Sequence, residues 1–203
     1  IDYNIQISTG PVVSFRSWDY IVNEDESENR NIAPLFWLHN IHKMYLRHPL
    51  IAKNKGQFIK VESGSKSILI KNKNYILLRR FSTKDDKSRL IAAPYFCNSI
   101  NVSYIGVENK LNYIYKINGH LERSEVLGLC SILNSELFDR YFQIINGNVN
   151  VSATELREMK FPPSETIREI GKKIILSNNY SMSHVNEIIN QYFELNLKDK
   201  VYE

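Results

Sequence analysis

Cysteines and long apolar runs are scarce in this chain of 203 residues, and its glycines do not cluster. The two cysteines, Cys97 and Cys130, lie in apolar surroundings without a Cys or His at ligand spacing. They are therefore expected to be small buried side chains in a reducing cytoplasm. No apolar run approaches the roughly 18 residues of a membrane span, and no basic segment followed by an apolar stretch opens the chain. We therefore expect a soluble cytoplasmic protein without a secretion signal.

The usual signatures of catalysis are also missing. The sequence contains neither a GxGxxG pattern nor a P-loop, and it has no GxSxG elbow and no HExxH. His39, His42 and His48 are close together, but no Cys or carboxylate joins them, and zinc requires three or four converging ligands. We predict no metal site, no cofactor site and no catalytic residue in this chain.

One short pattern keeps a catalytic alternative open. Glu108, Asn109 and Lys110 form an acid-x-Lys pattern at the end of a predicted strand, downstream of Asp85 and Asp86. Metal-dependent nucleases use an acid followed by such a pair to hold a magnesium ion and orient water. Because so short a match also occurs by chance, a magnesium-dependent endonuclease fragment remains an alternative.

The charge of the chain is distributed unevenly. Residues 39–90 contain 13 Lys or Arg and three acids, a local charge of +10, whereas the whole chain carries +4. Clustered cations neutralise phosphates and release counterions, so this asymmetry predicts a surface that binds a polyanion. The densest part, residues 79–89, lies between two strand-like runs, and a merely solvated connection between strands is the plainer alternative.

Apolar periodicity predicts an α+β fold, with a β-rich part at 1–118 that contains a mixed sheet and a helical part at 119–203 packed on it. The acidic residues 23–31 are expected to form a surface loop. No Pro-Gly-Ser linker separates the two parts, so we expect one shared core. We predict a hairpin or strand pair within 2–16 and strands at 34–40, 57–61, 67–70, 75–78, 90–96, 102–107 and 111–117.

Helical spacing begins after Gly119. It runs from 126 to 145, with Ser124 as a plausible cap and Asn134-Ser135 as a point that could divide the run into two helices. A one-turn helix opened by Ser152 or Thr154 follows, and amphipathic helices are predicted at 164–176 and 183–197. The last pair is equally compatible with facing solvent and with packing on a partner.

Five segments resemble a known family, and together they cover most of the chain. They are ISTGPVVSFR (7–16), PLFWLHNI (34–41), NYILLRRFSTKDDKSRLIAAPY (74–95), GVENKLNYI (106–114) and LNSELFDRYFQIINGNVNVSATELREMKFPP (133–163). They resemble the C-terminal target recognition domain of adenine-specific DNA methyltransferases from type II restriction-modification systems. The resemblance implies one recognition domain over 1–203 that reads double-stranded DNA.

Members of this family transfer a methyl group from S-adenosylmethionine to the exocyclic amine of adenine, after flipping the base into an Asn/Asp-Pro-Pro-aromatic motif. Phe161-Pro162-Pro163-Ser164 lacks the leading amide or acid and the trailing aromatic residue. The resemblance therefore implies that this chain alone is not an enzyme. It also implies that the catalytic domain, with its S-adenosylmethionine, lies upstream in the same polypeptide. A non-catalytic protein-interaction module remains a second alternative.

The predicted DNA contacts combine cations with polar side chains. Arg and Asn read guanine and adenine edges, whereas Lys and Ser position the backbone. Arg79 and Arg80 are neighbours on a strand and should point to opposite faces, so at most one reads a base. We expect the other to form an ion pair, with Asp85 and Asp86 as the candidate partners. The candidates are Arg16, Lys43, Arg47, Lys71, Lys73, Arg79, Arg80, Ser82, Lys84, Lys87, Arg89, Asn109, Lys110, Asn112 and Asn148.

Overall fold

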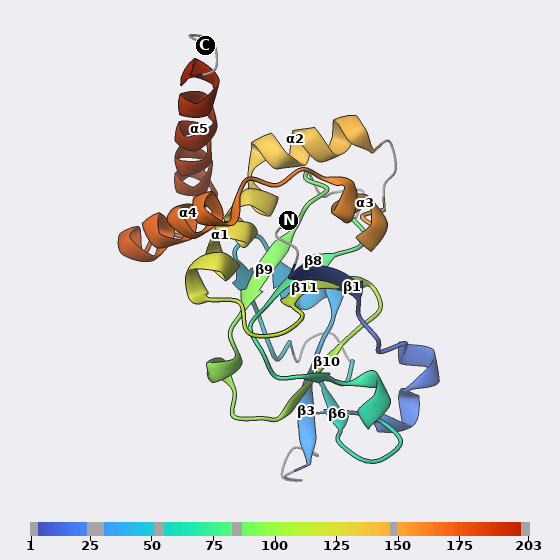
Figure 1. Ribbon diagram of the computed structural model, residues 1–203. Coiled ribbons are helices and arrows are strands. Elements are labelled where there is room, and N and C mark those ends of the chain that lie inside the picture. Colours follow the sequence, from blue (N-terminus) through green and yellow to red (C-terminus); the bar gives the residue numbers. More distant parts are fainter. Residues whose placement is uncertain (1–3, 24–30, 51–54, 83–86, 147–149, 200–203) are drawn as a thin grey trace.

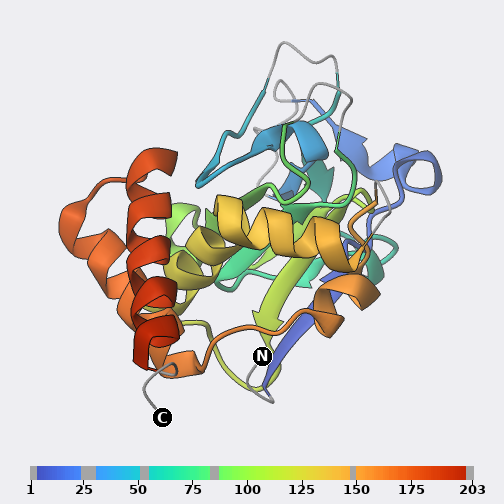
Figure 2. The same ribbon diagram turned by 90° about the horizontal axis from the view of Figure 1, so that it is seen from above.

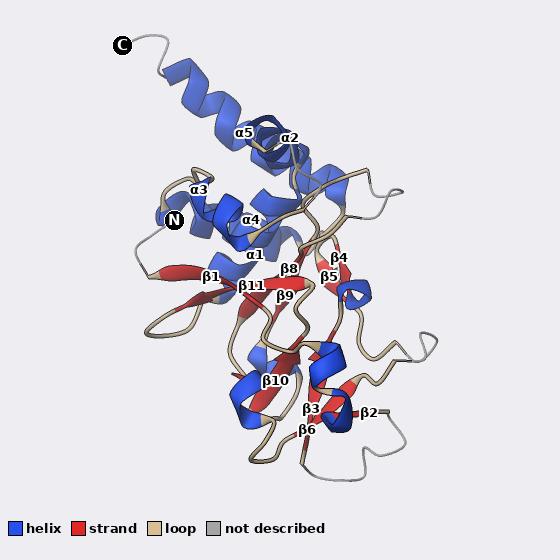
Figure 3. Ribbon diagram, turned by 90° about the vertical axis from the view of Figure 1, so that its right-hand side faces the viewer, coloured by secondary structure: helices blue, strands red, loops and turns tan. Residues whose placement is uncertain are grey.

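The computed structural model describes residues 4–23, 31–50, 55–82, 87–146 and 150–199, with side chains described up to Phe193 in the last helix (Figure 1). The fold is α+β, as predicted. Figure 3 shows the strands gathered in one half of the molecule and the long helices in the other. Among the described helices, none is long and apolar enough to cross a membrane.

A four-stranded antiparallel sheet lies between the helices and the remaining strands. Its order is β1 (Ile5–Thr9), β11 (Leu111–Lys116), β8 (Tyr75–Arg79) and β9 (Ala92–Tyr95). Ile76 and Leu78 belong to a hydrophobic cluster with the helices, whereas Tyr75 and Leu77 belong to a cluster with the second sheet. Both faces of β8 are therefore buried, which explains its continuous apolar run.

A second, mixed sheet of five strands packs beneath the first. Its order is β2 (Ile21–Val22), β6 (Phe58–Lys60), β3 (Ile32–Phe36), β10 (Tyr104–Val107) and β7 (Ile70–Lys71), with β10 parallel to β3. A short hairpin, β4 (Ile41–His42) and β5 (Tyr45–Leu46), packs against β8 and β9. Met44 forms its turn with a left-handed φ of 66° and donates its N–H to the Ala92 carbonyl.

The helical part consists of α1 (Arg123–Asn134), α2 (Glu136–Ile145), α3 (Ala153–Glu158), α4 (Ser164–Ser177) and α5 (Met182–Asp199). Seen from above in Figure 2, the orange-red α4 and α5 lie on one side and α3 on the other, with the yellow α2 between them. Helix α1 shares its hydrophobic cluster with β1, β8, β9 and β11, so the sheet and the helices have a common core.

Two glycines allow α1 and α4 to touch through their backbones. A Cβ atom on Gly128 would lie 1.9 Å from the Ile167 carbonyl oxygen, and one on Gly171 would lie 1.8 Å from the Ser124 carbonyl oxygen. Any side chain at either position would force the helices apart.

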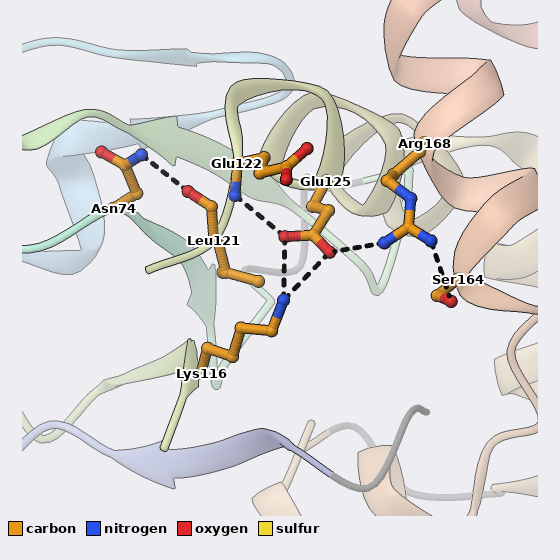
Figure 4. Close-up of polar contacts among 7 residues, drawn as sticks. All are labelled: Asn74, Lys116, Leu121, Glu122, Glu125, Ser164 and Arg168. Atoms are coloured by element: carbon orange, nitrogen blue, oxygen red, sulfur yellow. Dashed lines mark hydrogen bonds and ion pairs between the residues drawn. The ribbon is translucent and has the colours of Figure 1, made fainter. Parts of the chain in front are cut away.

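A buried carboxylate joins the sheet to both of these helices (Figure 4). Glu125, which is 3% exposed, lies 3.2 Å from Lys116 Nζ on β11 and 3.2 Å from Arg168 Nη1 on α4. Its other oxygen accepts the Glu122 N–H at 2.9 Å and so caps α1. Glu122 is therefore the residue that precedes α1, and the predicted cap Ser124 is wrong because it lies inside the first turn.

Other local predictions met different outcomes. The division at Asn134-Ser135 is confirmed, because the Ser135 hydroxyl accepts the Phe138 N–H and starts α2. Ser152 opens α3, as one of the two predicted caps. The strand pair within 2–16 is wrong, because β1 pairs with β11 and Ser14–Arg16 forms a 3-10 turn. The strand at 67–70 is also mostly wrong, since Lys66–Ile68 is another 3-10 turn.

Candidate nucleic-acid interface

Several chain segments meet at one end of the central sheet. In the strand register Thr9 opposes Asn112, Arg79 opposes Leu111 and Leu78 opposes Ala92. The end of β1, the start of β11, the end of β8 and the start of β9 therefore lie side by side. The residues beyond this end of the sheet are here called the basic end: Arg80, Phe81, Ser82, Lys87, Arg89, Asn109, Lys110 and Asn150.

Arg80 connects three segments of the basic end. Its backbone N–H donates to the Lys110 carbonyl at 2.9 Å, and its carbonyl accepts the Val151 N–H at 2.8 Å. Its Nη1 donates to the Asn109 carbonyl at 2.7 Å, and its guanidinium carbon lies 5.5 Å from the centre of the Phe81 ring. The loop after β8, the turn before β11 and the segment before α3 are thus held together by one residue.

Arg89 and Leu90, which lead into β9, are bonded to helix α2. Asp139 Oδ1, on α2, accepts the backbone N–H groups of Arg89 and Leu90 at 2.7 Å each, and Gln143 donates to its other oxygen at 2.8 Å. Arg89 Nη1 also donates to the Ser82 hydroxyl at 2.7 Å. The side chain of Lys87 is exposed beside this bridge, whereas the predicted contact Lys84 lies outside the described residues.

Arg79 belongs to the opposite face of the sheet. Its Nε and Nη2 both donate to the Ile41 carbonyl, at 2.9 and 2.6 Å, whereas Arg80 reaches Asn109. The two guanidinium groups thus bind different segments, and Arg80 lies just beyond the end of β8. The ion pair predicted with Asp85 or Asp86 lies outside the described residues.

Arg79 and Arg47 both lie near His42, a residue of the β4–β5 hairpin. The rings of His42 and Tyr45 stack at 4.6 Å with an interplanar angle of 8°. Burial lowers the pKa of His42, and the nearby charges of Arg79 and Arg47 lower it further. This imidazole therefore favours its neutral form, and the positive charge here comes from the two arginines.

Two predicted contacts lie near the start of β8, away from the basic end. Lys73 precedes the first residue of β8, and its Nζ donates to the Gly119 carbonyl at 3.2 Å. Lys71 lies in β7, where its carbonyl accepts the Tyr75 hydroxyl. The basic region of the sequence is thus divided between the two ends of β8.

Two further predicted contacts form hydrogen bonds within the fold. Lys43 Nζ donates to the carbonyl of Asn134, the last residue of α1, at 3.0 Å, and burial lowers the pKa of this amine. Asn112 is fully buried and donates to the Val151 carbonyl at 2.8 Å. Both side chains join elements of the fold rather than extend from the basic end. Asn148 lies outside the described residues.

The acid-x-Lys pattern forms a local ion pair. Glu108 is 1% exposed, and its Oε1 lies 3.7 Å from Lys110 Nζ. Desolvation raises the pKa of this carboxyl, while Lys110 and Lys55 oppose the rise. Within the described part of the chain, no group of three His, Cys, Asp or Glu side chains is placed to hold a metal ion.

Sequence reasoning missed two exposed aromatic residues. Phe15 and Trp18, in the 3-10 turns Ser14–Arg16 and Trp18–Tyr20, are 75% and 72% exposed. The predicted contact Arg16 lies between them, and its guanidinium carbon is 5.3 Å from the centre of the Phe15 ring. The missed signal was a pair of large aromatic residues after a Gly-Pro turn, because Phe15 was included in the hairpin or strand pair predicted within 2–16 and Trp18 was given no role.

Comparison with known proteins shows similarity between this chain and type II methyltransferases. No family model matches the chain. It is 32% identical over 194 residues to the type II methyltransferase M.PstI of Providencia stuartii, and 35% identical over 199 residues to the type II methyltransferase M.BsuBI of Bacillus subtilis. These alignments cover 96% and 98% of this chain but only 38% of each relative. The chain is thus similar to one part of type II methyltransferases, which supports a methyltransferase-related function.

Proposed function

We propose that this chain is the target recognition domain of an adenine-specific type II DNA methyltransferase. In this proposal it binds double-stranded DNA through the basic end and presents the target adenine to a catalytic domain upstream in the same polypeptide. The observation that carries the proposal is the convergence of Arg80, Arg89, Lys87 and Lys110 from separate segments at one end of one sheet.

The geometry of the basic end suits a duplex because its cations are positioned in advance. Arg80 and Arg89 are fixed by hydrogen bonds to Asn109 and Ser82, so little side-chain freedom remains to be lost on binding. Lys87 and Lys110 are exposed and suited to phosphate oxygens. The amides of Asn109 and Asn150 lie among these cations and supply the donor and acceptor pair that reads an adenine edge.

The proposal assigns separate tasks to this chain and to the catalytic domain. The proposed catalytic domain would bind S-adenosylmethionine, hold the flipped adenine and transfer the methyl group to its exocyclic amine. This chain would fix the position of the catalytic domain along the DNA sequence. We therefore expect no S-adenosylmethionine binding when the chain is titrated alone in a calorimeter, and measurable binding would contradict this division.

The DNA part of the proposal is tested with a labelled duplex of random sequence at several salt concentrations. Lys87→Ala and Lys110→Ala should each weaken binding and lower the salt slope by about one, because each removes one phosphate contact. Lys172→Ala is the matched control, since this lysine is exposed on α4, away from the basic end. Unchanged affinities and slopes in both variants would contradict the proposal.

Two other experimental outcomes would replace the proposed function with one of its alternatives. Magnesium-dependent cleavage that is lost in Glu108→Gln would favour the endonuclease alternative, whereas a protein partner that duplex DNA does not displace would favour an interaction module. The adenine specificity is tested separately by the upstream coding sequence, where a motif of the Asn-Pro-Pro-Tyr type is expected. A cytosine-type catalytic motif at that place would contradict it.

A further inference from the structure

The exposed pair Phe15 and Trp18 is anchored directly to the basic end. Gly10 N–H donates to the Leu111 carbonyl at 2.9 Å, and the Val12 carbonyl accepts the Asn109 N–H at 2.8 Å. These bonds fix the start of the segment on the turn that carries Lys110. Figure 1 shows the blue 3-10 turns and α3 on the same side of the molecule.

This anchor is close-packed. A Cβ atom on Gly10 would lie 2.3 Å from the Glu108 carbonyl oxygen, so only glycine allows the two backbones to approach this closely. The turns that follow are therefore held in place at their base, while the rings of Phe15 and Trp18 extend into solvent.

Large aromatic rings that are exposed on a fixed turn indicate a contact surface. The residues beside these rings indicate which kind of ligand this surface would bind. Arg16 lies against Phe15 at 5.3 Å, and Arg80 lies against the partly exposed Phe81 at 5.5 Å, so an arginine beside an aromatic ring occurs twice in the segments joined here. Asp19 is the only acid in the two turns. Aromatic rings alternating with cations are the arrangement that stacks on nucleobases while phosphates are neutralised.

We propose that Phe15 and Trp18 are stacking residues that contact nucleobases where the duplex is opened, beside the phosphates held by the basic end. This inference rests on the proposed function, because it assigns a role within the same DNA complex. Large apolar side chains can enter an unstacked base step, and an adenine that leaves the duplex opens such a step. The proposed occupant is therefore a base beside the flipped position.

The test compares Phe15→Leu and Trp18→Leu, which keep an apolar side chain but remove the ring. On a random-sequence single strand, whose bases are free to stack, each variant should bind about 5- to 100-fold more weakly, whereas on the closed duplex, where no base has left the stack, the loss should be small. The salt slope should stay unchanged because no phosphate contact is lost, whereas Arg16→Ala should lower it by about one. Leu176→Ser on α4, where Leu176 is 85% exposed, is the matched control and should bind normally.

Tryptophan emission provides a second measurement that needs no loss of binding. The chain has two tryptophans, and Trp37 is buried at 3% exposure with its Nε1 bonded to the Gly56 carbonyl. Quenching by DNA should therefore come from Trp18 and should be absent in Trp18→Leu.

The outcomes separate the inference from the function on which it rests. If both ring variants bind normally and DNA quenches no emission, while Lys110→Ala still weakens binding, the stacking role is overturned and the DNA function stands. If neither the ring variants nor Lys87→Ala and Lys110→Ala change binding, both proposals are overturned.

Discussion

Asp139 Oδ1 lies 2.7 Å from the backbone nitrogen of Arg89, so helix α2 fixes the position of the chain where it enters β9. Asp139→Ala should leave the N–H groups of Arg89 and Leu90 unpaired. The expected loss in the free energy of unfolding is about 2 kcal/mol or more, because an unpaired buried donor costs roughly 1–3 kcal/mol. Urea unfolding measures this loss, and Asp139→Asn, which keeps an acceptor at the same place, should lose less. Equal losses in the two variants would contradict this account.

Gly128 sets the distance between α1 and α4. Gly128→Ala places a methyl group against the Ile167 carbonyl, so it should destabilise the protein by about 1–3 kcal/mol or more. This should lower the denaturant midpoint at an unchanged slope. Lys172→Ala, at an exposed position on α4, is the control. A Gly128→Ala protein as stable as the parent would show that the helices separate without cost.

Glu108 should make stability depend on pH in the direction opposite to an ordinary paired carboxylate. Its pKa in the folded state is raised by desolvation, so the folded protein holds this proton more tightly than the unfolded chain does. The contribution of this carboxyl is most favourable below the pKa of the unfolded chain and is lost as the pH rises through the higher pKa of the folded state. Glu108→Gln should therefore stabilise the protein most at neutral and higher pH, and the gain should vanish in acid. Urea unfolding across this pH range measures the difference, and a variant less stable than the parent at neutral pH would show that the Lys110 ion pair dominates.

Lys43 should behave as a structural residue although its sequence context is basic. Lys43→Met keeps the apolar stem but removes the ammonium that binds the carbonyl at the end of α1. We expect a loss of about 1 kcal/mol in stability, since a cation at a helix C-terminus contributes on this scale. DNA affinity and its salt slope should be unchanged. A decrease in slope, as expected for Lys110→Ala, would return Lys43 to the DNA interface.

Arg79 and Arg80 offer a direct comparison of two adjacent cations. The Arg79 guanidinium is turned toward Ile41 and the β4–β5 hairpin, whereas Arg80 lies in the basic end. Arg80→Lys keeps the charge but loses the fork that reads a guanine edge, so it should weaken binding to the recognised site by about 1–3 kcal/mol and leave random DNA unaffected. Arg79→Lys should change neither affinity. The reverse pattern, measured by competition between the two duplexes, would exchange the roles.

The sequence predicted elements better than it predicted their partners. The α+β division and the break at Asn134-Ser135 depend on periodicity and local capping, which a few neighbouring residues determine. The pairing of β1 with β11 does not, because alternation shows that a segment is a strand without showing which distant strand it meets. The hairpin predicted within 2–16 failed for this reason.

The charge count of the basic region had a similar limit. Lys73 and Arg80 are close in sequence, yet the five residues of β8 separate them by roughly 15 Å or more at about 3.3 Å per residue. Counting charges along the chain therefore combined two ends of one strand. Burial of Asn112 was also hidden, because it depends on Val151 arriving from the helical part.

Under the proposed function, the hydrogen bonds of Arg80 bear on how recognition specificity can be altered. Because its guanidinium and backbone join the Asn109-Lys110 turn to the segment at Val151, these stretches form one cooperative unit. Exchanging only the Arg80 segment for that of M.PstI or M.BsuBI would keep the two backbone bonds, but it would remove the bond from the guanidinium to the Asn109 carbonyl wherever Arg80 is replaced. Under the proposed function, grafts between this chain and these relatives should transplant the Arg80 segment together with the Asn109-Lys110 turn, and sequence changes in the two should be correlated as the recognised site diverges.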